Sequence, residues 1–209
     1  MSNCKLISYT QPAISEVPDS ESLVAYTARV SNPANQNNWE TSTNLVKWLV
    51  NNHHWSPLEM VSVCIEIDTT RAISAQILRH RSFQFQEFSQ RYSKPEVNYP
   101  DLRERGSTNR QGSLDNLASY KAHELSVNAI DTAYDAYHLM IEEGVALESA
   151  RMVLPMCTKT TIYMQGSLRS WIHYIQLRAE EHTQKEHRII ALEIKDIITG
   201  IYPNIMEVL

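Results

Sequence analysis

The chain has 209 residues, 43% of them hydrophobic and 21% charged, so it can bury a core without disulfides or a structural metal. Its formal net charge of −5 argues against a general nucleic-acid binder, which usually has a basic balance. Its three cysteines are far apart and form no CxxC pair, which argues against a zinc ribbon or a disulfide framework.

The N-terminal segment has no basic stretch followed by an apolar core, and no apolar run approaches the roughly 18 residues of a membrane span. We therefore expect a cytoplasmic protein in a reducing compartment. Only five glycines occur, and none has the spacing of GxGxxG or of a P-loop. Any bound nucleotide phosphate should therefore meet side chains, and the arginines become the first candidates.

The N-terminal half of the chain mixes helices with strand patterns. We expect a helix over residues 22–30 and a second one that Thr41-Ser42-Thr43 caps and that ends near Val50. Pro57 places a turn at 53–59. Apolar residues alternate over 61–67, which predicts a half-buried strand.

The middle of the chain carries the polar motif residues. Thr69-Thr70 begins a predicted helix that ends at Leu78, and residues 82–92 read as an extended segment. In an extended segment Ser89 and Arg91 would point the same way. Residues 95–112 are polar and rich in turn formers, so we interpret them as a mobile loop that could cover a site.

The C-terminal half is dominated by helical patterns. We expect a long helix over 113–143 that Gly144 ends, a short helix over 147–154, a strand over 158–164 and a last long helix over 167–201. Helices and strands do not alternate regularly along the chain. The fold class that this order predicts is α+β: one domain over 1–209, with long helices packed on a mainly antiparallel sheet.

Arg79, Arg81 and Arg91 flank a segment that contains two serines and two glutamines. The planar guanidinium group donates paired hydrogen bonds that match phosphate oxygens. Ser89 adds a hydroxyl, and Gln76 can contact an amide or a ribose. The pattern suits a nucleotide phosphate, but a solvated face with surface salt bridges remains an alternative on chemistry alone.

Arg79-His80-Arg81, seven residues, then Ser89-Gln90-Arg91 resembles the signature of flavin-dependent thymidylate synthases. Further blocks are similar in the same order, at residues 54–59, 74–76, 150–155, 167–170 and 177–179, so the resemblance covers about residues 20–190. The chain departs from the usual family residues at four positions: Gln84, Gln86, Ser167 and His173. The departures concern flavin contacts.

This resemblance implies the thymidylate synthase complementing protein fold, FAD as cofactor, and conversion of dUMP to dTMP with NADPH and methylene-tetrahydrofolate as co-substrates. It also implies a homotetramer with active sites shared between subunits. One feature of the sequence agrees independently. Arg169 and Arg178 are nine residues apart on a predicted helix, hence about 180° apart, and would serve two pockets. From composition and residue spacing we expect no role for a metal, a membrane or a nucleic acid.

The resemblance also implies roles for individual residues. The predicted substrate-binding residues are Gln76, Arg79, Glu87, Ser89, Arg91, Arg151 and Arg178. The predicted FAD-binding residues are Ser56, Arg79, His80, Arg81, Glu87, Arg169 and His173. Arg178 is the predicted catalytic residue, because a cation at the uracil ring would stabilise negative charge on the pyrimidine and raise electron density at C5. His54 could line the flavin or folate region, and His182, four residues after Arg178, could support it from the same helix face.

Three other kinds of site remain to be weighed. Cys157 could act as a nucleophile, as in classical thymidylate synthase, but only Lys159 is near enough in sequence to lower its pKa. Ser89 has no His-Asp pair placed to activate it. His182 and His187 are five residues apart and HExxH is absent, which argues against a metal site. The alternative function is a nucleic-acid-binding module that uses the arginines with Phe83, Phe85 and Phe88.

Overall fold

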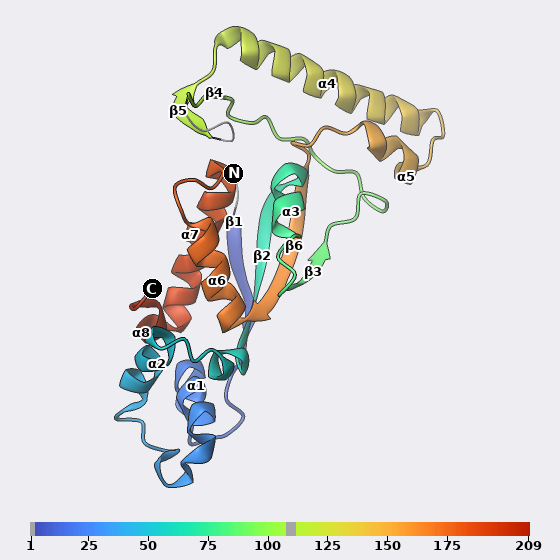
Figure 1. The fold of residues 1–209 in the computed structure, drawn as a ribbon. Helices are drawn as coiled ribbons and strands as arrows, with labels where there is room; N and C mark the ends of the chain where they lie inside the picture. The colour runs from blue at the N-terminus through green and yellow to red at the C-terminus, as the bar shows by residue number, and fades with distance from the viewer. Residues whose placement is uncertain (1–2, 108–111) are drawn as a thin grey trace.

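A four-stranded antiparallel sheet forms the centre of the computed structural model, which describes residues 3–107 and 112–209 (Figure 1). The strands are β1 (Asn3–Tyr9), β2 (Ser62–Thr70), β3 (Gln84–Glu87) and β6 (Lys159–Ser167), in the order β1-β2-β6-β3. β2 and β6 pair in continuous register from Ser62↔Ser167 to Thr70↔Lys159. The predicted α+β class with an antiparallel sheet is confirmed.

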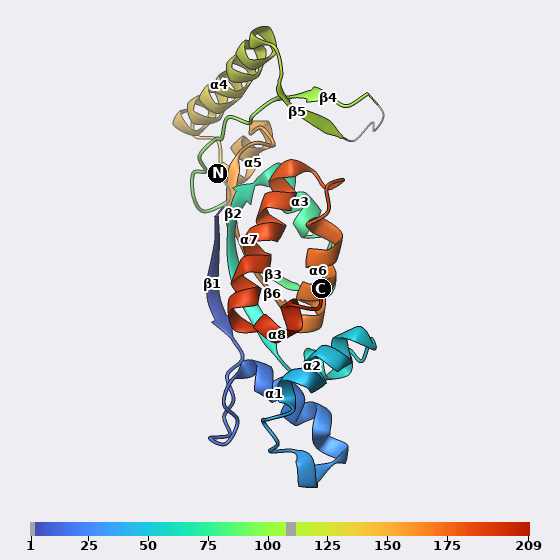
Figure 2. The same ribbon diagram turned by 90° about the vertical axis from the view of Figure 1, so that its left-hand side faces the viewer.

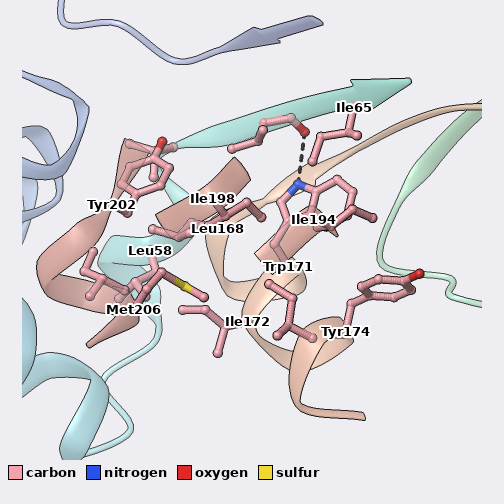
Figure 3. Packing of buried hydrophobic residues seen from close by; sticks show 14 of the residues in the cluster. Leu58, Ile65, Leu168, Trp171, Ile172, Tyr174, Ile194, Ile198, Tyr202 and Met206 are labelled. Atoms are coloured by element: carbon pink, nitrogen blue, oxygen red, sulfur yellow. Dashed lines mark hydrogen bonds between the residues drawn. The ribbon is translucent and has the colours of Figure 1, made fainter. Parts of the chain in front are cut away.

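Two helices, α6 (Leu168–Arg178) and α7 (Lys185–Ile201), cover one face of this sheet (Figures 1 and 2). The alternation predicted for β2 explains this, because Ile65 and Ile67 on that face are fully buried while their neighbours are half-exposed. Trp171 of α6 lies over the sheet and donates its indole N–H to the carbonyl of Val63 at 3.0 Å (Figure 3). The indole is fully buried, so this hydrogen bond satisfies its only polar group.

The base of the molecule is built from short helices that pack at one end of the sheet (Figure 2). They are α1 (Ser20–Ala28), α2 (Ser42–Asn51) and α8 (Pro203–Met206), with 3-10 turns at Arg29–Ser31, Pro33–Asn35 and Ser56–Glu59. Glu21 joins the two ends of the chain here, because its carboxylate accepts from the Asn204 amide at 2.7 Å and the Ile205 backbone at 2.8 Å. The predicted helices at 22–30 and up to Val50 are confirmed to within two residues at either end, although no Thr41 side chain caps the second one.

An arm projects from the opposite end of the sheet (Figure 1). It consists of β4 (Arg103–Arg105), β5 (Ser113–Leu117), α4 (Tyr120–Glu142), α5 (Leu147–Ala150) and the 3-10 turn Arg151–Val153. Only Ile130 and Tyr137 of α4 are buried in the chain. Gly144 follows α4 at φ +86°, as predicted, a conformation that glycine adopts without steric cost.

The arm corrects two predictions. Residues 113–117 form strand β5 rather than the first turns of a helix, and the helix begins only after Ser119, whose hydroxyl accepts from the Ala122 N–H. Leu114 and Leu117 have helical spacing, but β5 pairs with β4 in a hairpin and the backbone is satisfied there. The predicted loop at 95–112 contains β4, and its residues 108–111 lie outside the described part.

Two further predictions were wrong. The long helix expected over 167–201 is two helices, because the polar residues 179–184 form a turn in which the Thr183 N–H bonds the Glu180 carbonyl. His182 lies in that turn and does not continue the face of Arg178. The extended segment stops at Glu87, and Arg91 bends back so that its N–H meets the Ser89 hydroxyl at 3.4 Å. No helix among residues 3–107 and 112–209 has the length and apolar character needed to cross a bilayer.

Candidate active site

Three helical elements meet at one end of α6 and bring five polar residues together, which we name the Arg178 cluster. It contains Gln76 of α3 (Arg71–Ile77), His80 just beyond it, Tyr174 and Arg178 of α6, and His187 of α7. Arg178 Nε donates to His80 Nε2 at 3.0 Å. His187 bonds Gln76 Oε1 through Nδ1 at 3.1 Å and the Tyr174 hydroxyl through Nε2 at 3.0 Å. Two predicted substrate residues and one predicted flavin residue therefore lie in one cluster.

Both histidines of the Arg178 cluster are neutral at physiological pH. Burial, and then the positive charge of Arg178, lower the pKa of His80 to about 4. Burial, Arg178 and His80 lower the pKa of His187 to about 3. Burial also raises the pKa of the Tyr174 hydroxyl, which stays protonated. Arg178 is thus the only charged member of the cluster, and its hydrogen-bond partner His80 does not neutralise it.

Glu87 ends strand β3 with its carboxylate turned into the chain. Its Oε1 accepts from Arg71 Nη1 at 2.5 Å, from the Ser74 hydroxyl at 2.5 Å and from the Thr160 hydroxyl at 3.0 Å. These contacts tie β3 to α3 and β6. The contacts of Glu87 with substrate and flavin stay a prediction; within the chain, Glu87 holds the segment between Arg81 and Ser89 in place.

The predicted phosphate ligands Arg91 and Arg151 lie together elsewhere, in what we name the Arg151 cluster. Arg91 Nη2 is 3.4 Å from the Glu148 carboxylate, and Arg151 Nε donates to the Glu148 carbonyl at 3.3 Å. Both side chains come from the arm end of the molecule, beside α5 and the turn after β3. Within residues 3–107 and 112–209, no hydrogen bond or ion pair joins this cluster to Arg178.

Three of the predicted flavin residues lie at the other end of α6, in what we name the Arg169 cluster: Ser56, Arg169 and His173, together with Glu59 and Ser167. The Ser167 hydroxyl accepts from the Ser170 N–H and so starts α6 at this point. Arg169 Nη1 is 2.9 Å from Glu59 Oε1. The Ser167 hydroxyl, and then Arg169, lower the pKa of Glu59 against the effect of its partial burial. Ser56 begins the turn that carries Glu59.

Aromatic rings surround this cluster. The His173 ring lies 4.9 Å from Trp55, and His54 lies 4.7 Å from Trp48, which is half-exposed. His80 was grouped with these residues in the sequence prediction, but its contacts are with the Arg178 cluster at the opposite end of α6.

The arginine motif, Arg79-His80-Arg81, is followed two residues later by Phe83, whose ring fixes this segment to the core. This ring is buried, 4.7 Å from Trp171 and 6.0 Å from Tyr174, and it packs over Gly166. Arg79 and Arg81 are exposed, and in the described part of the chain neither has a carboxylate partner within 4 Å. Two unpaired cations on a rigid segment are suited to a bound anion.

Sequence reasoning missed a row of polar residues at the start of α7. Gln184, Glu186 and His187 continue the Arg178 cluster toward the arm, since Gln184 Oε1 accepts from Gln76 Nε2 at 2.7 Å. The sequence signal for this row is the run of four polar residues Gln184-Lys185-Glu186-His187. It was treated as the interior of one long helix, whereas it is the first turn of α7 and faces α3.

The family model described as thymidylate synthase complementing protein matches residues 5–204. The chain belongs to this family. A probable flavin-dependent thymidylate synthase of Paramecium bursaria Chlorella virus 1 is 42% identical over 214 residues, covering 99% of this chain and 98% of the relative. A flavin-dependent thymidylate synthase of Synechocystis sp. is 43% identical, with 98% of each chain covered.

A solved structure supports the fold of the family member described here. The UMP/dUMP methylase PolB from Streptomyces cacaoi, bound with 5-Br dUMP, superposes with a TM-score of 0.81. The similarity covers 100% of this chain and 94% of that one at 24% sequence identity, so it shows the shared fold.

Cys157 does not have the surroundings of a nucleophile. It is half-buried just before β6, and burial raises the pKa of its thiol. Its backbone carbonyl accepts from the Asn98 N–H, a contact that joins two chain segments. A thiol with a raised pKa is a weak nucleophile at neutral pH, so the surroundings of Cys157 suit a packing residue.

Proposed function

We propose that this protein is a flavin-dependent thymidylate synthase, which converts dUMP to dTMP with FAD as cofactor and with NADPH and methylene-tetrahydrofolate as co-substrates. Similarity over the full chain to relatives with that name supports the reaction. The structural observation that carries the proposal is Arg178, whose guanidinium group has one hydrogen-bond partner among the described residues, a neutral histidine. The alternative of a nucleic-acid-binding module is not supported.

Arg178 is the residue that we assign to the pyrimidine ring. Its positive charge would stabilise negative charge on the ring oxygens and N3, and so raise electron density at C5, the carbon that gains the methyl group. His80 orients the guanidinium group through its Nε2 acceptor and leaves the charge intact, because its pKa of about 4 keeps the ring neutral. Preorganised charge of this kind needs no rearrangement during the reaction.

We assign the dUMP phosphate and sugar to Arg79, Arg91 and Arg151, with help from Gln76 and Ser89. The separation of the Arg151 and Arg178 clusters within one chain supports a site that two subunits share. One protomer would contribute Arg91 and Arg151 from its arm, and its neighbour would contribute Gln76 and Arg178.

The surface of the arm supports an oligomer. Tyr120, Leu125 and Leu139 of α4 are 85%, 61% and 60% exposed, and Met152 beyond α5 is 80% exposed. Apolar side chains gathered on one projecting element indicate an interface. We therefore propose the homotetramer that is implied by the sequence. A reducing compartment such as the cytoplasm suits the protein, because Cys4, Cys64 and Cys157 are all free thiols.

The donor set of the chain fits FAD. Ser56, Arg169 and His173 would hold it together with Arg79, His80 and Arg81. The exposed guanidinium groups suit a diphosphate, and the Trp55–His173 pair offers a ring surface to a planar group. When bound, FAD supplies the hydride that no side chain can deliver. Glu59 orients the Arg169 guanidinium through the ion pair at 2.9 Å.

Two arginine variants on one helix test this division of roles. Arg178→Ala should abolish dTMP formation while FAD still binds, because Arg178 is assigned to dUMP. Arg169→Ala, the matched control at the other end of α6, should weaken FAD binding. FAD binding is read from the absorbance of the yellow protein and dTMP from chromatography. Equal loss of FAD binding and dTMP formation in Arg178→Ala would contradict the assignment, and a wild-type protein that never binds FAD would contradict the function.

A further inference from the structure

A row of hydrogen bonds leads from the arm into the Arg178 cluster, and its outer end is Glu186. Arg103 of β4 donates to both oxygens of this carboxylate, from Nη1 at 2.5 Å and from Nη2 at 3.0 Å. Burial would raise the pKa of Glu186, but the hydrogen bonds from Arg103, the Glu186 backbone and Gln184 outweigh it and lower the pKa. Glu186 is therefore ionised and can only accept hydrogen bonds.

An ionised Glu186 decides how two neighbouring amides are turned. Gln184 must present its nitrogen to the carboxylate, and its Nε2 donates to Glu186 Oε2 at 3.0 Å. Gln184 Oε1 then faces Gln76 and accepts from Gln76 Nε2 at 2.7 Å. The opposite orientation of either amide would bring two acceptors together, so the network fixes both.

The orientation of Gln76 in turn decides the tautomer of His187. Gln76 Oε1 can only accept, so the hydrogen lies on His187 Nδ1, 3.1 Å away. The ring is neutral, and Nε2 is left to accept from the Tyr174 hydroxyl at 3.0 Å. His187 is fully buried, and both of its ring nitrogens are used. From Tyr174 to Glu186 every hydrogen bond runs in one direction.

We propose that His187 is a positioning residue that holds the Gln76 amide with its nitrogen turned toward the substrate site. One hydrogen of Gln76 Nε2 goes to Gln184, and the second is left for an acceptor oxygen of the nucleotide. The contact of Gln76 with His187 is part-buried, while its contact with Gln184 is exposed, so the nitrogen lies on the open side. This inference rests on the proposed function, because it takes dUMP as the ligand of Gln76.

The direction of the row matters for recognition. The oxygens of a nucleotide phosphate are acceptors, and so are the uracil carbonyls. An amide turned the other way would offer them a carbonyl oxygen and repel them. Glu186 and Gln184 set the direction of the row, and His187 holds the Gln76 oxygen at its inner end, so Gln76 offers a donor without His187 touching the nucleotide.

Binding of dUMP to the FAD-loaded protein tests the proposal, measured by calorimetry. His187→Leu removes the Nδ1 donor and should raise the Kd for dUMP by about 3- to 10-fold, the range expected for one hydrogen bond, while FAD affinity stays unchanged. His187→Gln keeps an N–H donor at this position and should recover part of the affinity. The same loss in His187→Gln and His187→Leu would overturn the proposal.

A double-mutant cycle asks whether His187 acts through Gln76. In a Gln76→Ala background, His187→Leu should cost no further dUMP affinity. Additive losses would mean that His187 acts by another route and would overturn the proposal. Wild-type protein that fails to bind dUMP would overturn the proposed function and this inference together. Normal dUMP binding in His187→Leu would overturn the inference alone.

Nitrogen NMR of the His187 ring gives a readout that a merely structural role would not move. The wild-type ring should carry its hydrogen on Nδ1, and Tyr174→Phe, which removes the donor to Nε2, should shift the Nε2 signal while Gln76 keeps the hydrogen on Nδ1. Tyr202→Phe is the matched control, since Tyr202 is also fully buried and its hydroxyl bonds Ser20 at 2.7 Å. It should leave ring signals and dUMP affinity unchanged. A wild-type ring protonated at Nε2 would overturn the proposal.

Discussion

Gly166 of β6 leaves the space that Phe83 occupies, and we predict that Gly166→Ala destabilises the fold. A Cβ at Gly166 would meet the Phe83 ring at Cδ1, with Cε1 at 2.6 Å and Cγ at 3.3 Å, inside ordinary contact distance. The ring cannot easily retreat, because Trp171 lies 4.7 Å away between centroids and Phe83 is only 6% exposed. Phe83 lies two residues after Arg81, so its displacement would also disturb the substrate site that we propose.

The size of the effect follows from core overpacking. An added methyl group in a filled core costs about 1–3 kcal/mol, and we expect the upper part of this range because the ring is enclosed. Urea unfolding of wild type and variant measures it as a lower midpoint at an unchanged slope. Phe83→Leu in the Gly166→Ala background should cost less than the sum of the two single changes, since the smaller side chain relieves the contact.

The same substitution at Gly200 is the control. Gly200 lies in the last turns of α7, where a Cβ would meet nothing within 4 Å. Gly200→Ala should stabilise the protein by up to about 1 kcal/mol through helix propensity. If Gly166→Ala leaves the urea midpoint of wild type unchanged, the ring moves aside freely and the argument from packing is refuted.

Three further predictions concern the site. Arg151→Ala and Arg178→Ala proteins should each be inactive, but mixing them, with dissociation and reassembly, should restore dTMP formation. Some shared sites would then contain both wild-type arginines. A mixture that stays inactive would contradict a shared site. Cys157→Ala should keep dTMP formation within about twofold, since a half-buried thiol with a raised pKa is a weak nucleophile, and complete loss would overturn this. The folded-state pKa values of His80 and His187 are about 4 and about 3, below the ordinary value of 6.5, so the unfolded chain binds more protons at acid pH. The stability that the two neutral histidines contribute is therefore fully present above pH 6.5. It is lost as the pH falls through the folded-state pKa values. At about 1.36 kcal/mol per pH unit, His187 should lower the free energy of unfolding by about 2 kcal/mol at pH 5, and the part-exposed His80 should lower it by less. Urea unfolding as a function of pH measures this loss. A His187→Gln variant with the same acid sensitivity as wild type would refute the prediction.

The sequence predicted those elements whose pattern is local. The alternation along β2 and the left-handed Gly144 after α4 are examples, because each is set by neighbours in the chain. The break between α6 and α7 was missed because residues 179–184 contain no Pro or Gly to mark it, and Ala179, Glu180 and Glu181 favour a helix. They turn only because α7 must return across the sheet. The hydrogen bonds of His187 were missed because its partners, Tyr174 and Gln76, lie 13 and 111 residues away in the sequence.

The family resemblance names candidate site residues, but it does not give their grouping in the fold. Arg79, Arg169 and Arg178 were named from the motif, but only the fold separates them, with Arg169 and Arg178 at opposite ends of one helix. Spacing along a helix gives the angle between two side chains. It does not give the neighbours that each one meets.

The arm has a consequence for how the protein behaves at low concentration. A single chain leaves most of α4 in water, with Leu125 and Leu139 uncovered. In the homotetramer that we propose, other copies would bury that helix and complete the folded state. Dilution should therefore lower thermal stability and activity together. Substitutions along α4 would then act as assembly defects, and raising the protein concentration would correct them, whereas no concentration would restore a chain without Arg178.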